Sequence, residues 1–127
     1  MNDKHQAFSV AARVRSMAYA FTGVAGMLRD QHNAWIHCLA TFAVLAAGFL
    51  FGVSRIEWLA LIFAITLVWV AEALNTAFEY LCDVASPEFH PLVEKSKDIA
   101  AGAVLLASLG AVAVGVVVFL PYLLALF

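Results

Sequence analysis

The stretch IAAGAVLLASLGAVAVGVVVFLPYLLALF, residues 99–127, decides the fold, because it contains 29 consecutive positions without a charged residue. A helix rises about 1.5 Å per residue, so roughly 20 apolar residues cross the ~30 Å hydrocarbon core of a bilayer. Pro121, near the far end, could kink or end such a helix. We therefore predict a transmembrane helix over residues 97–126.

Two more apolar stretches precede this one. Residues 34–53 form a 20-residue run in which His37 and Cys38 are the only ionisable side chains. The next run is uncharged from Trp58 to Ala71 and then continues through EALNTAFEYLC, which contains two glutamates. Both runs are long enough to cross a bilayer. We predict transmembrane helices over residues 34–53 and 58–82.

The overall composition agrees with a membrane protein. The chain has 127 residues, of which 65% are hydrophobic and 13% are charged, whereas soluble domains have about 45–50% apolar and about 25% charged residues. Its length suits one domain, residues 1–127. The net charge of −2 and the lack of a basic run with interleaved aromatic residues exclude nucleic-acid binding.

The N-terminal segment, about residues 6–30, has a different pattern. Its apolar residues alternate spacings of four and three, which places them on one helical stripe: Val10, Val14, Met17, Phe21, Val24 and Leu28. Basic residues lie outside that stripe at Arg13, Arg15 and Arg29. This pattern favours an amphipathic helix on the membrane surface, and the alternative is a soluble helix packed on a partner.

Positive charges predict the orientation. Of the seven Lys and Arg residues, six flank the same ends of the predicted spans: Lys4, Arg13, Arg15, Arg29, Lys95 and Lys97. Arg55 alone lies on the opposite side. The positive-inside rule then places the N-terminus of this multi-pass protein in the cytoplasm.

Polar residues share one face of the second predicted span. At about 100° per residue, four of them fall within roughly 60° of Glu72 around the helix axis: Asn75, Thr76, Glu79 and Asp83. A carboxylate at membrane depth costs at least about 2.5 kcal/mol and normally faces a polar partner or cavity. A Mg²⁺ ion, with its preference for oxygen ligands, would relieve the repulsion between two such groups. The alternative, above all for Asp83, is that this end of the span is solvated at the membrane interface.

The loop between the second and third spans adds cationic groups. We expect Lys97 and Asp98 to open the third helix, whose N-terminus would offer free N–H groups to phosphate. A solvated loop with a snorkelling lysine is the alternative. Together with the glutamates, the loop completes the groups that phosphoryl transfer requires. There is no GxxxxGK[ST] motif, so a nucleotide site would be of another kind.

The segments EALNTAFEYLCD (72–83) and HPLVEKSKDIAAGAVLLAS (90–108) resemble the prokaryotic diacylglycerol kinase family. The resemblance implies an all-α membrane protein with an N-terminal amphipathic surface helix and three transmembrane helices, assembled as a homotrimer. It implies an enzyme of the bacterial cytoplasmic (inner) membrane that uses ATP and Mg²⁺, with its active site on the cytoplasmic side.

The resemblance also implies roles for individual residues. Glu72 matches the family's catalytic base, Asn75 a residue that supports it, and Glu79 a ligand of Mg²⁺. Gln31 falls where some members have a second metal-binding glutamate, and a neutral amide contributes no charge, although neighbouring Asp30 could compensate. The positions that match the nucleotide site are Arg15, Tyr19, Asp83, Glu88, His90, Lys97 and Asp98.

The substrate has two candidates. The run KDIAAGAVLLAS (97–108) is more similar to the branch of the family that phosphorylates undecaprenol, and diacylglycerol is the alternative. In both cases a membrane lipid and ATP are the molecules bound. Two other classes of function remain open on the residues alone: a transport subunit in which Glu72 and Glu79 carry protons or cations, and a non-enzymatic membrane scaffold.

Overall fold

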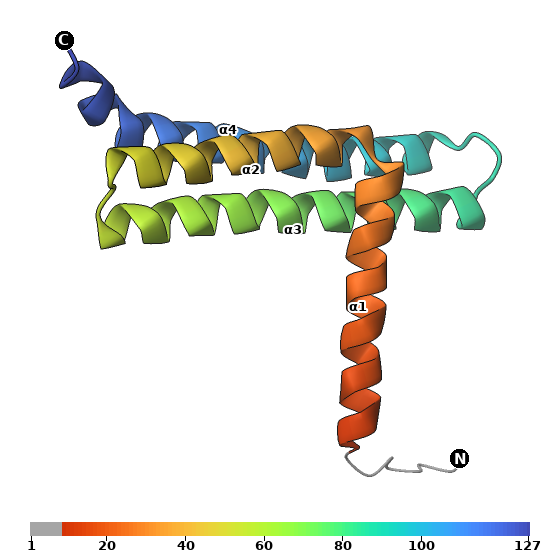
Figure 1. The fold of residues 1–127 in the computed structure, drawn as a ribbon. Helices are drawn as coiled ribbons and strands as arrows, with labels where there is room; N and C mark the ends of the chain where they lie inside the picture. The colour runs from red at the N-terminus through yellow and green to blue at the C-terminus, as the bar shows by residue number, and fades with distance from the viewer. Residues whose placement is uncertain (1–8) are drawn as a thin grey trace.

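The computed structural model describes residues 9–127, which form four helices in the order α1 (Val10–Asp30), α2 (His32–Phe51), α3 (Arg55–Ala85) and α4 (Pro91–Leu124). Figure 1 shows α2, α3 and α4 running alongside one another, with α1 crosswise to them. These three helices are long and apolar enough to cross a membrane. The predicted all-helical membrane fold is confirmed, and its surface helix corresponds to α1.

Side-chain caps set where three of the helices begin, and those of α1 and α3 come from serines. Ser9 accepts a hydrogen bond from the N–H of Ala12 at the start of α1, so the helix starts at Val10; residues 6–8 of the predicted helix lie outside the described residues. At the start of α3, the Glu57 N–H donates to Ser54 Oγ (3.3 Å) and the Ser54 N–H donates to Glu57 Oε2 (2.7 Å). This capping box satisfies free helix donors, and it starts α3 three residues before the predicted position 58.

The start of α4 differs from the expectation. Pro91 occupies its first turn, and the imidazole Nδ1 of His90 accepts a hydrogen bond from the N–H of Leu92 (3.2 Å). Proline suits the first helical position because its missing N–H would have no partner there. Lys97 and Asp98 therefore lie within the helix, with their N–H groups in intrahelical bonds. The prediction that they open the third helix is wrong.

A glycine ends α2, whereas a proline near the end of α4 lies within the helix. Gly52 adopts the left-handed conformation (φ 63°) and ends α2, as glycine can at low cost. Pro121 does not end α4, which continues to Leu124. Figure 1 shows the last turns of α4 bending away from the bundle, as expected where a proline removes an intrahelical hydrogen bond.

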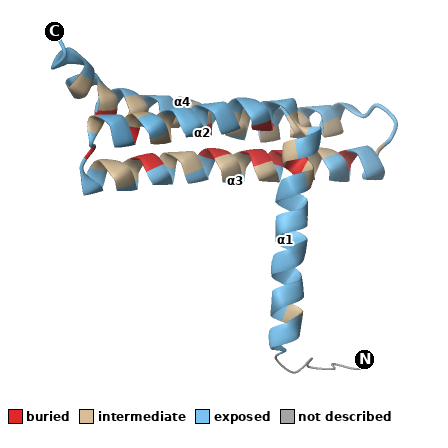
Figure 2. Cartoon of the chain, in the orientation of Figure 1, coloured by how far each residue is buried: buried red, intermediate tan, exposed pale blue. Residues whose placement is uncertain are grey.

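The core of the chain is small and lies at the end of the bundle opposite the α3–α4 loop. Val53, Leu61 and Val118 form a buried cluster there, and Tyr122 of α4 donates a hydrogen bond to Glu57 Oε2 at 2.8 Å. Figure 2 shows that most of the remaining residues are exposed. Many of these exposed residues are large and apolar. This surface suits contact with lipid or with other subunits.

Gly48 allows α2 to approach Trp58 of α3. A Cβ added at Gly48 would lie 2.6 Å from the indole ring, whereas one at Gly110 of α4 would meet no atom within 4 Å. We expect Gly48→Ala to destabilise the fold by about 1–3 kcal/mol, the usual cost of overpacking. Thermal unfolding in detergent would show a lower midpoint for Gly48→Ala than for the control Gly110→Ala. Equal midpoints would contradict the close approach.

Candidate active site

The buried polar side chains of the described residues all lie on α3. Glu72, Asn75 and Thr76 are 1%, 7% and 4% exposed, respectively. Glu72 is also one of the two largest side chains that are fully buried. Burial of a carboxylate inside a membrane-spanning helix is expensive, so such a residue marks a functional site unless a partner neutralises it.

Three of the predicted site residues share one cavity. Glu72, Asn75 and Glu79 line a space of about 290 Å³, to which α2 contributes Asn33, Ile36 and His37. Its remaining wall comes from α4 and is made of Ala101, Val104, Leu105 and Ser108. Within the cavity, the Asn75 amide Nδ2 donates to Glu79 Oε1 at 3.2 Å. The cavity is therefore formed by all three spanning helices, with its carboxylates on α3.

His37 was not among the predicted site residues, yet its imidazole contacts the Glu72 carboxylate. Its Nε2 lies 3.4 Å from Glu72 Oε2. Both atoms are buried and have no hydrogen-bond partner within residues 9–127. The signal in the sequence was an ionisable residue inside the first predicted span, which is unusual at membrane depth.

Residues of the predicted polar face of α3 line two different cavities. Thr76 does not line the Glu72 cavity but a second one, of about 420 Å³, between α1 and α3. Asp30 lines this second cavity too and accepts a hydrogen bond from the Tyr80 hydroxyl at 3.4 Å. Gln31 lies at the junction of α1 and α2, two residues before Asn33 of the Glu72 cavity. Asp30 therefore lines a different cavity from Glu79, and Gln31 lines neither of the two.

The α3–α4 loop encloses a third cavity, of about 240 Å³, and four of the predicted nucleotide-site residues line it: Asp83, Glu88, His90 and Lys97. Lys97 Nζ lies 3.0 Å from Asp83 Oδ1 and so ties α4 to the end of α3. Asp98 is exposed beside this group. The loop thus brings one cation and several acceptors together at the end of α3.

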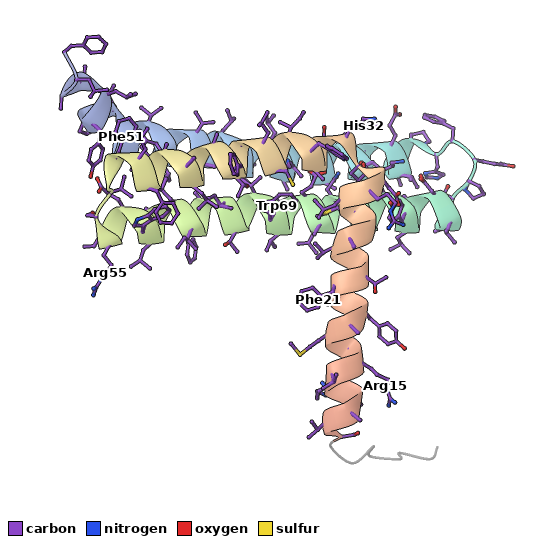
Figure 3. The ribbon with its side chains drawn as sticks, viewed as in Figure 1. Arg15, Phe21, His32, Phe51, Arg55 and Trp69 are labelled. Carbon is purple, nitrogen blue, oxygen red and sulfur yellow. The ribbon has the colours of Figure 1, made fainter. Side chains whose placement is uncertain are left out.

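Two predicted residues lie apart from the others. Tyr19 is 73% exposed, and Arg15 is also exposed on α1. Figure 3 shows Arg15 toward the outer end of α1, well away from the three spanning helices. Within one chain, the structure does not bring these side chains to the loop cavity.

The carboxylate oxygens of Glu79 are suitable ligands for a hard cation. Over residues 9–127 no group of three or more His, Cys, Asp and Glu side chains is arranged to hold a metal ion. Mg²⁺ does not require one, because it usually takes one or two carboxylates and completes its shell with substrate phosphates and water. The half-buried Glu79 carboxylate, held by Asn75, supplies such a ligand.

Comparison with known proteins gives consistent matches. The family model described as "Prokaryotic diacylglycerol kinase" matches residues 18–119. The chain is similar to the undecaprenol kinase of Bacillus subtilis, with 37% identity over 109 residues that cover 86% of this chain and 89% of that protein. It is also similar to the diacylglycerol kinase of Synechocystis, with 40% identity over 112 residues, covering 87% of this chain but 64% of that longer protein. A diacylglycerol kinase of Helicobacter pylori is 38% identical over 68 residues, 54% of this chain and 52% of that protein.

Proposed function

This chain belongs to the prokaryotic diacylglycerol kinase family and is a membrane lipid kinase, and we propose that it phosphorylates undecaprenol to undecaprenyl phosphate with ATP. The observation that carries the reaction is the buried Glu72 carboxylate, which faces a cavity that it shares with Asn75 and Glu79. The sequence match with the B. subtilis undecaprenol kinase supports the substrate, because it extends over nearly the full length of both chains.

Diacylglycerol is the second candidate substrate. The Synechocystis diacylglycerol kinase has the higher identity, 40%, although this chain covers less than two thirds of its length. Both lipids present a primary hydroxyl at the membrane interface, and the same base could deprotonate either. Selectivity between undecaprenol and diacylglycerol therefore depends on how the spanning helices bind the hydrocarbon chain of the lipid.

In the proposed mechanism, Glu72 accepts the proton of the lipid hydroxyl as that oxygen bonds to the γ-phosphorus of ATP and the bond to the ADP oxygen breaks. General-base assistance of this kind contributes about 10²–10⁴-fold. Asn75 supports the site by donating to Glu79 (3.2 Å). Glu79 would hold Mg²⁺, with the side-chain oxygen of Gln31 as a neutral second ligand. The ion would neutralise charge on the phosphates when bound.

For the nucleotide we propose the loop cavity of Asp83, Glu88, His90 and Lys97, together with neighbouring Asp98. Lys97 is the cation there, and its present partner is the exposed carboxylate of Asp83. An exposed ion pair contributes little stability, so a phosphate can replace Asp83 at low cost. His90 also caps α4 through Nδ1, which keeps the loop in place.

A homotrimer would complete this site. Arg15 and Tyr19 lie on α1 away from the bundle of their own chain, and we propose that they reach the nucleotide of a neighbouring subunit. The exposed apolar surface of α2 and α4 supports such an assembly, since lipid or another subunit must cover it. Small residues on α4 that are not buried within the chain, such as Gly102 and Ala103, favour close helix packing.

We propose that the protein lies in the bacterial cytoplasmic membrane with its N-terminus and site facing the cytoplasm. The beginnings of α2 and α4 and the end of α3 lie at one end of the bundle, as Figure 1 shows. Lys95 and Lys97 lie at that end, and Arg55 begins α3 at the other. This distribution supports a cytoplasmic location of the loop cavity.

The purified protein, given labelled ATP with equal amounts of undecaprenol and diacylglycerol, should transfer label predominantly to undecaprenol. Each lipid alone, at matched mole fraction in the same detergent, is the control for unequal dispersion. Predominant labelling of diacylglycerol would overturn the substrate assignment. No labelling of either lipid would overturn both lipid assignments and favour a transport function for the buried glutamates.

A further inference from the structure

His37 of α2 and Glu72 of α3 form a buried pair that the mechanism above does not use. Their facing atoms, Nε2 and Oε2, are 3.4 Å apart, and the side chains are 14% and 1% exposed. Neither atom has a hydrogen-bond partner in the described chain, and the contact between them is recorded as an ion pair at this distance. A buried polar atom without a partner is costly, so two such atoms facing each other indicate an interaction. The distance is longer than an ordinary hydrogen bond, as is common for catalytic groups before the substrate binds.

The imidazole of His37 is itself held in place. Its ring meets the indole of Trp69 edge to face, with centroids 6.0 Å apart and planes at 69°. The Trp69 Nε1–H donates to Thr41 Oγ1 at 3.0 Å, and Thr41 lies one helical turn after His37. Figure 3 shows Trp69 on α3 beside α2. The indole is therefore fixed to the helix that carries His37, and it restricts the rotation of the imidazole.

We infer that His37 is a positioning residue for Glu72: its Nε2–H donates to Glu72 Oε2 and leaves Oε1 free for the hydroxyl proton of the lipid. This inference rests on the proposed role of Glu72 as the base. A carboxylate that is free to rotate would present either oxygen in many directions, whereas one oxygen held from α2 aims the other into the shared cavity. Both residues line that cavity, so the pair lies where the substrate hydroxyl would arrive.

Two substitutions at His37 separate positioning from packing. Leucine fills the space but has no N–H, whereas glutamine carries an amide nitrogen the same number of bonds from Cα as the imidazole Nε2. We expect His37→Leu to lower kcat about 10- to 100-fold, the range found when a residue that orients a metal ligand is lost. The KM values for ATP and for the lipid should stay within about twofold of the wild type. His37→Gln should retain kcat within about fivefold of the wild type.

His32→Leu is the matched control, because it makes the same change at an exposed histidine at the start of the same helix, and it should leave kcat unchanged. A wild-type kcat in His37→Leu would overturn the inference. So would an equal fall in His37→Leu and His37→Gln, because a role in packing or folding predicts that result.

A second measurement does not depend on activity. Among the four histidines, the His37 ring nitrogens can be assigned in ¹⁵N NMR spectra as the signals missing from His37→Gln. We expect the Nε2 signal to shift when Glu72 is changed to glutamine, and an unchanged signal would overturn the pairing. If the wild type phosphorylated no lipid, the proposed function would fail, and the NMR result would still decide whether the two side chains interact.

Discussion

Replacing Glu72 with glutamine should abolish lipid phosphorylation, lowering kcat by about 10²–10⁴-fold, the usual contribution of a general base. The change keeps the volume of the side chain and its ability to hydrogen-bond in the cavity, so it removes the proton acceptor and little else. The KM for Mg²⁺-ATP should change little, because the proposed ligands of the ion and of the nucleotide are other residues, namely Glu79 and the side chains of the loop cavity. Labelled-ATP transfer to the lipid, measured at saturating concentrations of both substrates, checks this.

Glu57→Gln is the matched control, since it makes the same change at the opposite end of the same helix. Its amide oxygen can still accept from the Ser54 N–H and the Tyr122 hydroxyl, and its kcat should equal that of the wild type. Both variants should keep the wild-type mass in detergent, which for a homotrimer is three chains of 13.7 kDa. Normal turnover in Glu72→Gln would refute the base, and a wild-type mass of one chain would refute the trimer.

Replacing Glu79 with alanine should raise the KM for Mg²⁺-ATP about 10- to 100-fold, the scale on which altered metal sites lose affinity. The physical reason is the loss of the carboxylate that lines the Glu72 cavity and would bind the ion. Raising the Mg²⁺ concentration should restore part of the rate. Initial rates over a matrix of ATP and Mg²⁺ concentrations measure both effects.

Glu79→Gln separates the charge of this residue from its hydrogen bond. The amide oxygen of glutamine can still accept from Asn75 Nδ2, which lies 3.2 Å from Glu79 Oε1, but it contributes no negative charge. If the carboxylate binds the metal, Glu79→Gln should resemble Glu79→Ala. If it served only to hold Asn75, Glu79→Gln should resemble the wild type, and that outcome would count against the metal role, as would full activity of Glu79→Ala at unchanged Mg²⁺.

The starts of α3 and α4 are marked in the sequence more accurately by capping residues than by hydrophobicity. The motif Ser54-Arg-Ile-Glu57 is a capping box that starts α3 at Arg55, but the expected start followed the uncharged run from Trp58. In the same way, His90-Pro91 marks the start of α4, whereas the charges at Lys97 and Asp98 predict a start that is too late. Hydrophobicity predicts where a helix meets lipid, whereas caps determine where the helix begins.

The amino-acid sequence by itself determined that this chain has three helices able to cross a membrane and carries glutamates in the second. Those properties are local: each depends on the length of one apolar run and on the charges within it, as in residues 99–127 and at Glu72. Only the tertiary structure decided how the polar face of α3 is divided. Helix rotation and the neighbouring helices direct Glu72 toward His37 and Thr76 toward α1. Periodicity places side chains around one axis, but the packing of several helices determines which of them meet.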